Sequence, residues 1–173
     1  MSNLDVASYN RQGKVFVASN VSAKSVVAVA TVMTGLILYN PASSNKKAIL
    51  VDAGFAWTTV PIAVNNIGIA LAKPNPTVPI NLTVAGGAAT SADGLGNAGA
   101  VIAYDAATLA VAPVALRWFG GAAWASAASV SPYNILDHVD GSIVLAPGVV
   151  ACLTVVTTTA VGLGSFTWIE VPA

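Results

Sequence analysis

Charged residues are scarce in this chain of 173 residues: they make up 8% of it, against about 25% in a typical soluble domain. Hydrophobic residues make up 55%. Much of the outer surface must therefore consist of Ala, Val, Thr, Ser and Gly, and such a surface is usually covered by a partner. The seven Lys and Arg residues balance the seven Asp and Glu residues and form no basic block, which argues against nucleic acid as the main partner.

Long apolar runs are missing as well. The uncharged stretch 25–45 is interrupted by Thr, Gly, Asn and Pro, and its apolar part is shorter than the roughly 20 residues that a membrane-spanning helix needs. The first residues contain no apolar core of the kind found in a secretion signal. We therefore expect no membrane partner and synthesis in the cytoplasm.

Residue types that carry chemistry are few. A single cysteine, Cys152, excludes an internal disulfide, and its apolar surroundings VVACLTVV indicate a buried side chain. The single histidine, His138, shares a strand face with Asp140 alone in the segment DHVD, so a metal site would need ligands from elsewhere. The other carboxylates are scattered, and no Gly-x-Ser-x-Gly motif occurs. We expect no enzymatic activity, no cofactor and no metal.

Short runs of β-branched and aromatic residues, separated by Gly, Pro and Asn, fill the chain instead. They predict strands at 14–20, 25–34, 36–39, 48–59, 67–72, 80–85, 101–104, 114–119, 142–146, 149–156 and 164–171. Alternation in 48–59 places Ile49, Val51, Ala53, Phe55 and Trp57 on one face. The predicted fold is an all-β, jelly-roll-like β-sandwich of about eight to ten strands. An immunoglobulin-like sandwich ranks second because the chain lacks a cysteine pair.

The predicted organisation is an extended N-terminal arm, residues 1–13, followed by a single β-sandwich domain, residues 14–173. Gly- and Ala-rich segments 86–100 and 120–134 are expected to be surface loops.

Four residues are candidate interface anchors. Tyr9 and Arg11 lie in the polar arm and are candidates to anchor it to a neighbouring molecule. The alternative interpretation of this arm is an ordinary frayed terminus. Trp124 and Tyr133 lie in the loop 120–134 and are candidates for a subunit contact, because buried aromatic side chains contribute most to such contacts. Alternatively, Trp124 folds back on the sandwich. Trp118 and Phe119 fall on opposite faces of one strand, so we expect one of them to point away from the core.

Two segments carry a family resemblance. They are 34–50, TGLILYNPASSNKKAIL, and 141–172, GSIVLAPGVVACLTVVTTTAVGLGSFTWIEVP. In both segments the chain resembles small structural proteins of tailed bacteriophages. There, a strand ending in Tyr-Asn-Pro precedes a polar turn and a long apolar strand, and an Ala-Pro-Gly turn precedes a final Gly-Ser-Phe-x-Trp-x-Glu strand.

The resemblance implies a capsid decoration (cement) protein with a jelly-roll fold. Such a protein is made in the host cytoplasm and binds the major capsid protein on the virion surface as a homotrimer at three-fold positions. The family has no active-site residues, so the resemblance implies none for this chain. A head-fibre or spike component is the alternative within the group. Two alternatives belong to other classes of protein. One is a trimeric binding module like tumour necrosis factor or C1q, and the other is a glycan-active enzyme or lectin-like host-binding module.

Overall fold

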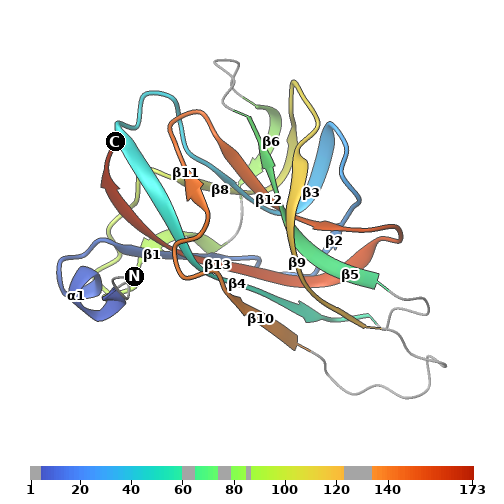
Figure 1. Cartoon of the computed structure of the whole chain (residues 1–173), viewed down its shortest axis with the longest axis horizontal. Coiled ribbons are helices and arrows are strands. Elements are labelled where there is room, and N and C mark those ends of the chain that lie inside the picture. The colour runs from blue at the N-terminus through green and yellow to red at the C-terminus, as the bar shows by residue number, and fades with distance from the viewer. Residues whose placement is uncertain (1–4, 60–64, 74–78, 85–86, 123–133) are drawn as a thin grey trace.

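A computed structural model describes residues 5–59, 65–73, 79–84, 87–122 and 134–173, which form one short helix and thirteen strands (Figure 1). The elements are α1 (Val6–Arg11), β1 (Val15–Ser19), β2 (Lys24–Val26), β3 (Val32–Tyr39), β4 (Lys46–Trp57), β5 (Asn65–Ala72), β6 (Ile80–Val84), β7 (Gly87–Ser91), β8 (Ile102–Thr108), β9 (Val114–Ala122), β10 (Asn134–His138), β11 (Val144–Leu145), β12 (Val150–Val155) and β13 (Ala160–Pro172).

The strands form two antiparallel sheets that pack face to face. Sheet A has the order β10-β4-β13-β1-β7, with β11 beside β4 and β2 beside β13. Sheet B has the order β6-β8-β3-β12-β5-β9. The predicted all-β sandwich is confirmed, with more strands than expected because β7 lies within the predicted loop 86–100 and β10 forms where no strand was predicted.

Eight strands pair in a nested order along the chain. The first pairs with the last (β1 with β13), the second with the seventh (β3 with β12), the third with the sixth (β4 with β10) and the fourth with the fifth (β5 with β9). Nested pairing of eight strands across two sheets is the arrangement of a jelly roll. The segment between β5 and β9 is an insertion: β6 and β8 extend sheet B beyond β3, and β7 extends sheet A beyond β1. The insertion therefore covers one edge of the sandwich, whereas β9 and β10 end the described sheets at the other.

The main core lies between the inner faces of the sheets. Its largest fully buried side chains are Phe55, Phe166 and Trp168 from sheet A and Leu36, Ile67 and Leu153 from sheet B. Each stabilises the fold by about 1.5–3 kcal/mol relative to an exposed position. Trp168 also stacks on Phe16, with ring centroids 6.1 Å apart.

A bulge in β4 corrects the predicted face assignment. Leu50 pairs with Trp168 and Asp52 with Thr167, so Val51 is an extra residue without a counterpart on β13. A bulge reverses the side-chain alternation that follows it. Consequently Leu50 shares the inner core with Ala53 and Phe55, whereas Ile49 and Val51 pack on the outer face of sheet A. The prediction that Ile49 and Val51 share a face with Phe55 is wrong.

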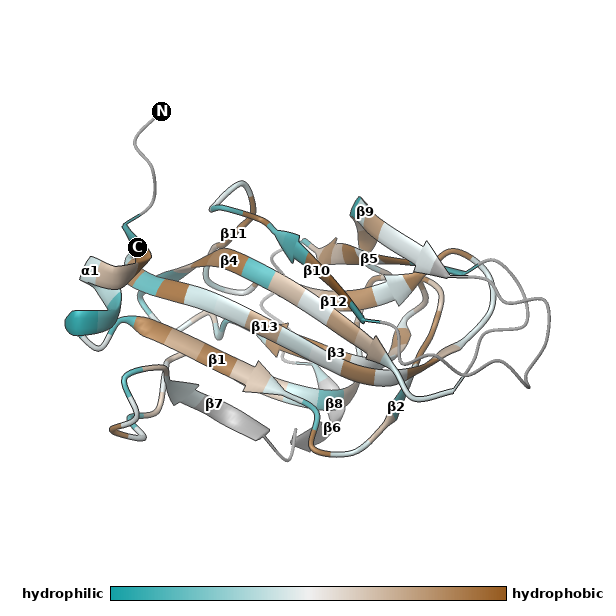
Figure 2. Cartoon of the chain, turned by 90° about the horizontal axis from the view of Figure 1, so that it is seen from below, coloured by the Kyte–Doolittle hydropathy of each residue, from teal (hydrophilic) through white to brown (hydrophobic). Residues whose placement is uncertain are grey.

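The N-terminal segment is helical over Val6–Arg11, so the expected extended conformation is wrong for the described part of the arm. The carboxylate of Asp5 accepts a hydrogen bond of 3.0 Å from the backbone N–H of Ser8 and caps α1. Val6 and Tyr9 pack against the outer face of sheet A around Val15, Val51 and Ile169. A helix of six residues is too short to be stable alone, so this packing holds it at the end of the sheet where β1 begins (Figure 2).

The two motifs that carry the family resemblance lie against each other. The fully buried side chain of Asn40 donates hydrogen bonds to the carbonyls of Lys46 and Leu145, at 2.8 and 2.9 Å. The Asn40 carbonyl accepts a hydrogen bond of 2.7 Å from the backbone N–H of Gly148. Gly148 has a φ of 86°, in the left-handed region that favours glycine. Asn40 thus ties the turn after β3 to the Ala-Pro-Gly turn before β12.

Candidate interaction surface

The carboxylate of Asp105 joins the sheets near the edge that the insertion covers. Its Oδ2 lies 3.0 Å from the Lys24 ammonium, and its Oδ1 accepts a hydrogen bond of 2.6 Å from the buried Asn20 side chain. The Oδ1 of Asn20 in turn accepts a hydrogen bond of 2.9 Å from the backbone N–H of Gly164. This chain of contacts links β8 in sheet B to β13 in sheet A.

Glu170 on β13 fixes the insertion to sheet A. Its Oε2 accepts a hydrogen bond of 2.9 Å from the backbone N–H of Ala100, and its Oε1 accepts one of 3.1 Å from that of Val101. The indole N–H of Trp168 donates a further bond of 3.2 Å to Oε1. The buried carboxylate is therefore fully engaged in holding the chain that leads into β8.

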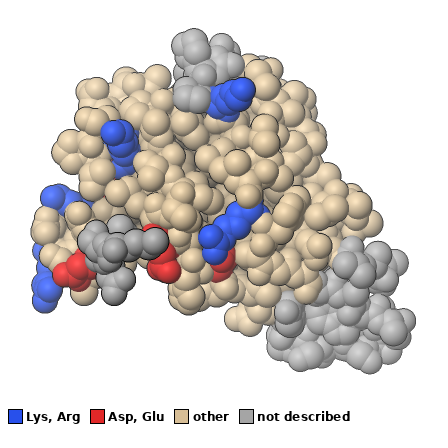
Figure 3. Space-filling view, viewed as in Figure 1, with Lys and Arg blue, Asp and Glu red and all other residues tan. Residues whose placement is uncertain are grey.

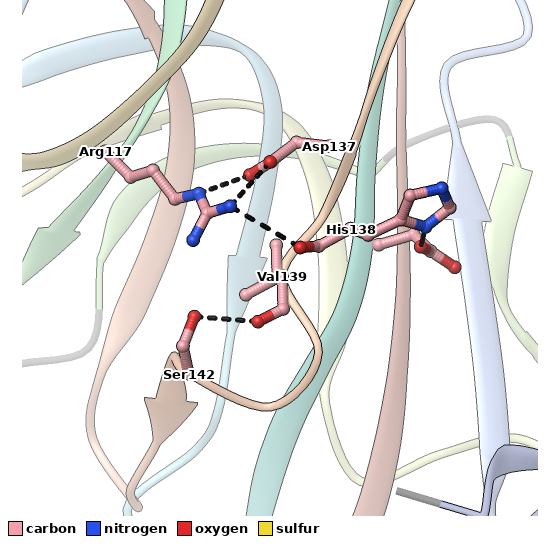
Figure 4. Close-up of polar contacts among 6 residues, drawn as sticks. Arg117, Asp137, His138, Val139 and Ser142 are labelled. Atoms are coloured by element: carbon pink, nitrogen blue, oxygen red, sulfur yellow. Dashed lines mark hydrogen bonds and ion pairs between the residues drawn. The ribbon is translucent and has the colours of Figure 1, made fainter. Parts of the chain in front are cut away.

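A bidentate ion pair joins the sheets at the other edge (Figure 4). Arg117 Nε lies 2.7 Å from one carboxylate oxygen of Asp137, and Nη2 donates a 2.8 Å hydrogen bond to the other. The same Nη2 lies 3.4 Å from the carbonyl oxygen of His138. Because Arg117 is on β9 and Asp137 on β10, the pair bridges the last strands of the two sheets, and we call it the edge bridge.

The other titratable groups that the structure describes lie apart from the edge bridge. His138 Nδ1 lies 2.7 Å from Asp52 on the exposed face of sheet A. Among the residues that the structure describes, no three His, Cys, Asp or Glu side chains are grouped to hold a metal ion. Hydrogen bonds from Ser91 and then from the backbone of Leu95 lower the pKa of Asp93. Burial raises the pKa of the Cys152 thiol to about 12, which keeps it protonated and unreactive.

The four residues expected at an interface lie in different places. Tyr9 packs against the chain's own sheet A, and Arg11 is exposed at the end of α1. Trp124 and Tyr133 lie outside the described residues. The expectation for the neighbouring aromatic pair is confirmed: Trp118 is exposed, whereas Phe119 packs against the core.

Among the side chains that the structure describes, the longest run of exposed apolar residues on one strand is on β9. Val114, Leu116 and Trp118, at every second residue, are 57%, 55% and 44% exposed. A strand normally turns one face to the core and a polar face to water. Here the outward residues are large and apolar, and they stand at the edge of sheet B. This apolar stripe is an unusual feature for a surface in contact with water.

An apolar groove of about 350 Å³ lies beside the stripe. One wall contains Val114 and Leu116 of β9, and the other contains Val144 of β11, which is 44% exposed. Val149 belongs to the main core and Leu71 packs against it, and both residues also line the groove. The groove therefore opens from the surface toward the space between the sheets. The stripe and this groove together form the candidate interaction surface.

The groove contains a single charged side chain in its lining. Lys73 is exposed and lines the groove on the side of β5. Asp140 is exposed in the turn that leads into β11 and does not line the groove. Neither side chain has a hydrogen bond or ion pair within the described part of the chain. Figure 3 shows that the face carrying β9 and β11 is mostly uncharged.

Sequence reasoning located β9 but did not identify this surface. Strand 114–119 was predicted at nearly its observed position, and the alternation of Val114, Leu116 and Trp118 is legible in it. Its outward face is uncovered because β9 is the last strand of sheet B, and the sequence pattern does not indicate that place in the sheet.

No helix within the described residues has the length and apolar character needed to cross a membrane. Comparison of the chain with protein-family models, with curated proteins and with solved structures found no significant match.

Proposed function

We propose that this chain is a structural protein of a tailed-bacteriophage virion. In this proposal it is a capsid decoration (cement) protein that binds the outer surface of the assembled capsid as a homotrimer and stabilises it. Its partners are further copies of itself and the major capsid protein. Its contribution is shape and contact, without a chemical reaction.

The candidate interaction surface is the observation that carries this proposal. The stripe and groove expose large aliphatic side chains and Trp118 on an edge strand, which favours burial against another protein. The polar groups support the same interpretation, because Asp105, Asp137 and Glu170 each hold parts of the sandwich together. A domain that uses its carboxylates in this way is suited to a mechanical role.

The virion assignment rests on the resemblance of segments 34–50 and 141–172 to phage structural proteins. The contacts between these segments support it. Asn40 of the Tyr-Asn-Pro motif is bonded to Leu145 and Gly148 around the Ala-Pro-Gly turn. The two motifs therefore belong to one structural unit of the jelly roll, which is what a shared fold would preserve.

The test is to add the purified protein to undecorated capsids of the virus that encodes it. We expect co-sedimentation and a higher capsid melting temperature. Because apolar contacts dominate the surface, binding should change little between about 50 and about 500 mM salt. Protein that neither co-sediments with capsids nor raises their melting temperature overturns the proposal. Binding to glycans or host cells would then be measured, to test the head-fibre, spike or lectin alternatives.

A further inference from the structure

We propose that the side chains of Lys24 and Asn20 join in an intramolecular amide bond, which forms with release of ammonia and is promoted by the carboxylate of Asp105. The bond is a modification of the folded chain by its own groups. It links the residue directly after β1 to the first residue of β2. This inference does not depend on the proposed function.

The nucleophile and the leaving group of this reaction lie on the two oxygens of one carboxylate. Asp105 Oδ2 is 3.0 Å from Lys24 Nζ, and Asp105 Oδ1 accepts a hydrogen bond of 2.6 Å from Asn20 Nδ2. Because both contacts end on the same group, the amine and the amide are held side by side. Such positioning is the main requirement for a reaction between two side chains.

The partners of Asn20 orient its amide and polarise its carbonyl. An ionised carboxylate only accepts hydrogen bonds and a backbone N–H only donates, so Nδ2 faces Asp105 and Oδ1 faces Gly164. The N–H of Gly164 donates its bond to Oδ1 over 2.9 Å. A donor at this place stabilises the negative charge that develops on the oxygen when an amine adds to the carbonyl carbon.

The surroundings of the amide are apolar. Asn20 and Asp105 are only 5% and 6% exposed. Gly164 allows the core to approach them, because a Cβ on it would lie 2.5 Å from Leu153 Cδ1 and 3.1 Å from Asn20 Oδ1. An ammonium and a carboxylate that exchange a proton both become neutral, which costs less in such surroundings than the burial of two charges.

The reaction needs no group beyond these side chains. Lys24 gives one proton to Asp105, and its neutral amine attacks Cγ of Asn20, so that the new bond displaces the carbonyl electron pair onto Oδ1. Asp105 then protonates Nδ2 and takes the second proton from Nζ. The electron pair on Oδ1 restores the carbonyl, the Cγ–Nδ2 bond breaks, and ammonia leaves as ammonium with the proton that Asp105 holds. A cavity of about 370 Å³ that Asn20 and Gly164 line offers an exit.

Asp105 carries protons in this scheme and is not the group that Lys24 attacks. Attack on its carboxyl carbon would require a second acid to release water. Within the described part of the chain, Lys24 has no other carboxylate at ion-pair distance. Asn20 has both its leaving group on an acid and its carbonyl oxygen on a donor. The expected loss is therefore ammonia and not water.

The test is mass spectrometry of the purified full chain after incubation in the folded state. We expect a mass about 17 Da below that of the 17.3 kDa sequence, because one ammonia is lost. Trypsin cleaves after unmodified lysine, so digestion of the denatured protein should leave 15–46 as one peptide, with normal cleavage after Lys14 and Lys46. Blocked cleavage at Lys24 distinguishes the bond from a cyclised asparagine, which loses the same mass.

Two results overturn the inference. One is cleavage after Lys24 as complete as after Lys46. The other is a loss of about 18 Da with Lys24 joined to a peptide that contains Asp105, which would make Asp105 the group attacked.

Lys24→Arg is the matched control, because its guanidinium keeps the ion pair with Asp105 but does not attack a carbonyl carbon. It should fold, as circular dichroism verifies, and retain the full mass; the same mass loss in this variant overturns the inference. Asp105→Asn still offers an oxygen to Asn20 but no carboxylate to carry protons, so the bond should form at least about 100-fold more slowly. A folded Asp105→Asn protein that forms it at the unaltered rate overturns the role of Asp105. If this variant does not fold, the peptides of the unaltered chain and of Lys24→Arg decide the question.

Discussion

Replacing Glu170 by Gln removes one charge from the interior with almost no change in volume. Gln retains an oxygen that can accept from Val101 and Trp168, but its amide group then faces the backbone N–H of Ala100. One hydrogen bond to a charged group is lost, worth about 1.5–3 kcal/mol. Ala100 is half-buried and gains partial compensation from water. We therefore expect the free energy of unfolding to fall by about 2 kcal/mol, which lowers Tm by roughly 4–8 °C.

Thermal unfolding followed by circular dichroism measures this effect, with Asp5→Asn as the control. Asp5→Asn also removes one negative charge, but asparagine keeps the oxygen that caps α1, so its stability should change by less than about 0.5 kcal/mol. Hydrogen exchange at Ala100 and Val101 should accelerate in the Glu170 variant, because these amides lose the group that anchors them. A Glu170→Gln protein that melts within a degree of the control would refute a structural role for this carboxylate.

Two further substitutions and a labelling experiment probe the packing. Gly162→Ala should destabilise the fold by about 1–3 kcal/mol, because its Cβ would collide with the carbonyl oxygen of Ala56 and the ring of Phe55. Gly94→Ala should cost only about 1 kcal/mol, because its Cβ meets nothing and only its φ of 80° is strained; denaturant unfolding measures both, and equal losses would contradict the packing argument. Because burial raises the pKa of Cys152 to about 12, a disulfide reagent at about pH 8 should label it only as the protein unfolds, and rapid labelling of the folded protein would disprove its burial.

The sandwich was predictable because each strand leaves a local signal. Alternating apolar residues and Gly, Pro and Asn turns mark strands without reference to the rest of the chain, and most predicted strands lie within two or three residues of the observed ones. The strand expected at 25–34 is an exception, since β2 ends at Val26 and β3 begins at Val32. There the chain crosses from sheet A to sheet B. Because apolar residues lie on both sides of the crossing, the sequence pattern does not show that the strand is interrupted.

The bulge at Val51 shows why the face assignment failed. Both faces of β4 are apolar before the bulge, with Ala48 and Leu50 inside and Ile49 and Val51 outside. An alternating pattern cannot reveal an inserted residue when either register buries apolar side chains. The same bulge turns Ile49 and Val51 outward and so creates the patch that α1 covers. The sequence does contain a signal for this helix, with Asp5 as its cap and Val6 and Tyr9 on one side. The helix is stabilised, however, by packing on the outward side chains of β4.

The few charges of this chain explain how its surface can be so apolar without loss of a unique fold. Asp105 joins the sheets near the covered edge, the edge bridge joins them at the other edge, and Glu170 fixes the insertion. Each of these carboxylates is mostly buried and paired. Removing Asp105 or Glu170 would leave a buried partner unsatisfied, the Asn20 side chain or the backbone N–H of Val101. Little charge then remains for recognition. The proposed binding to capsids therefore depends on the stripe and the groove, and Leu116→Lys should reduce co-sedimentation with capsids more than Lys73→Glu does.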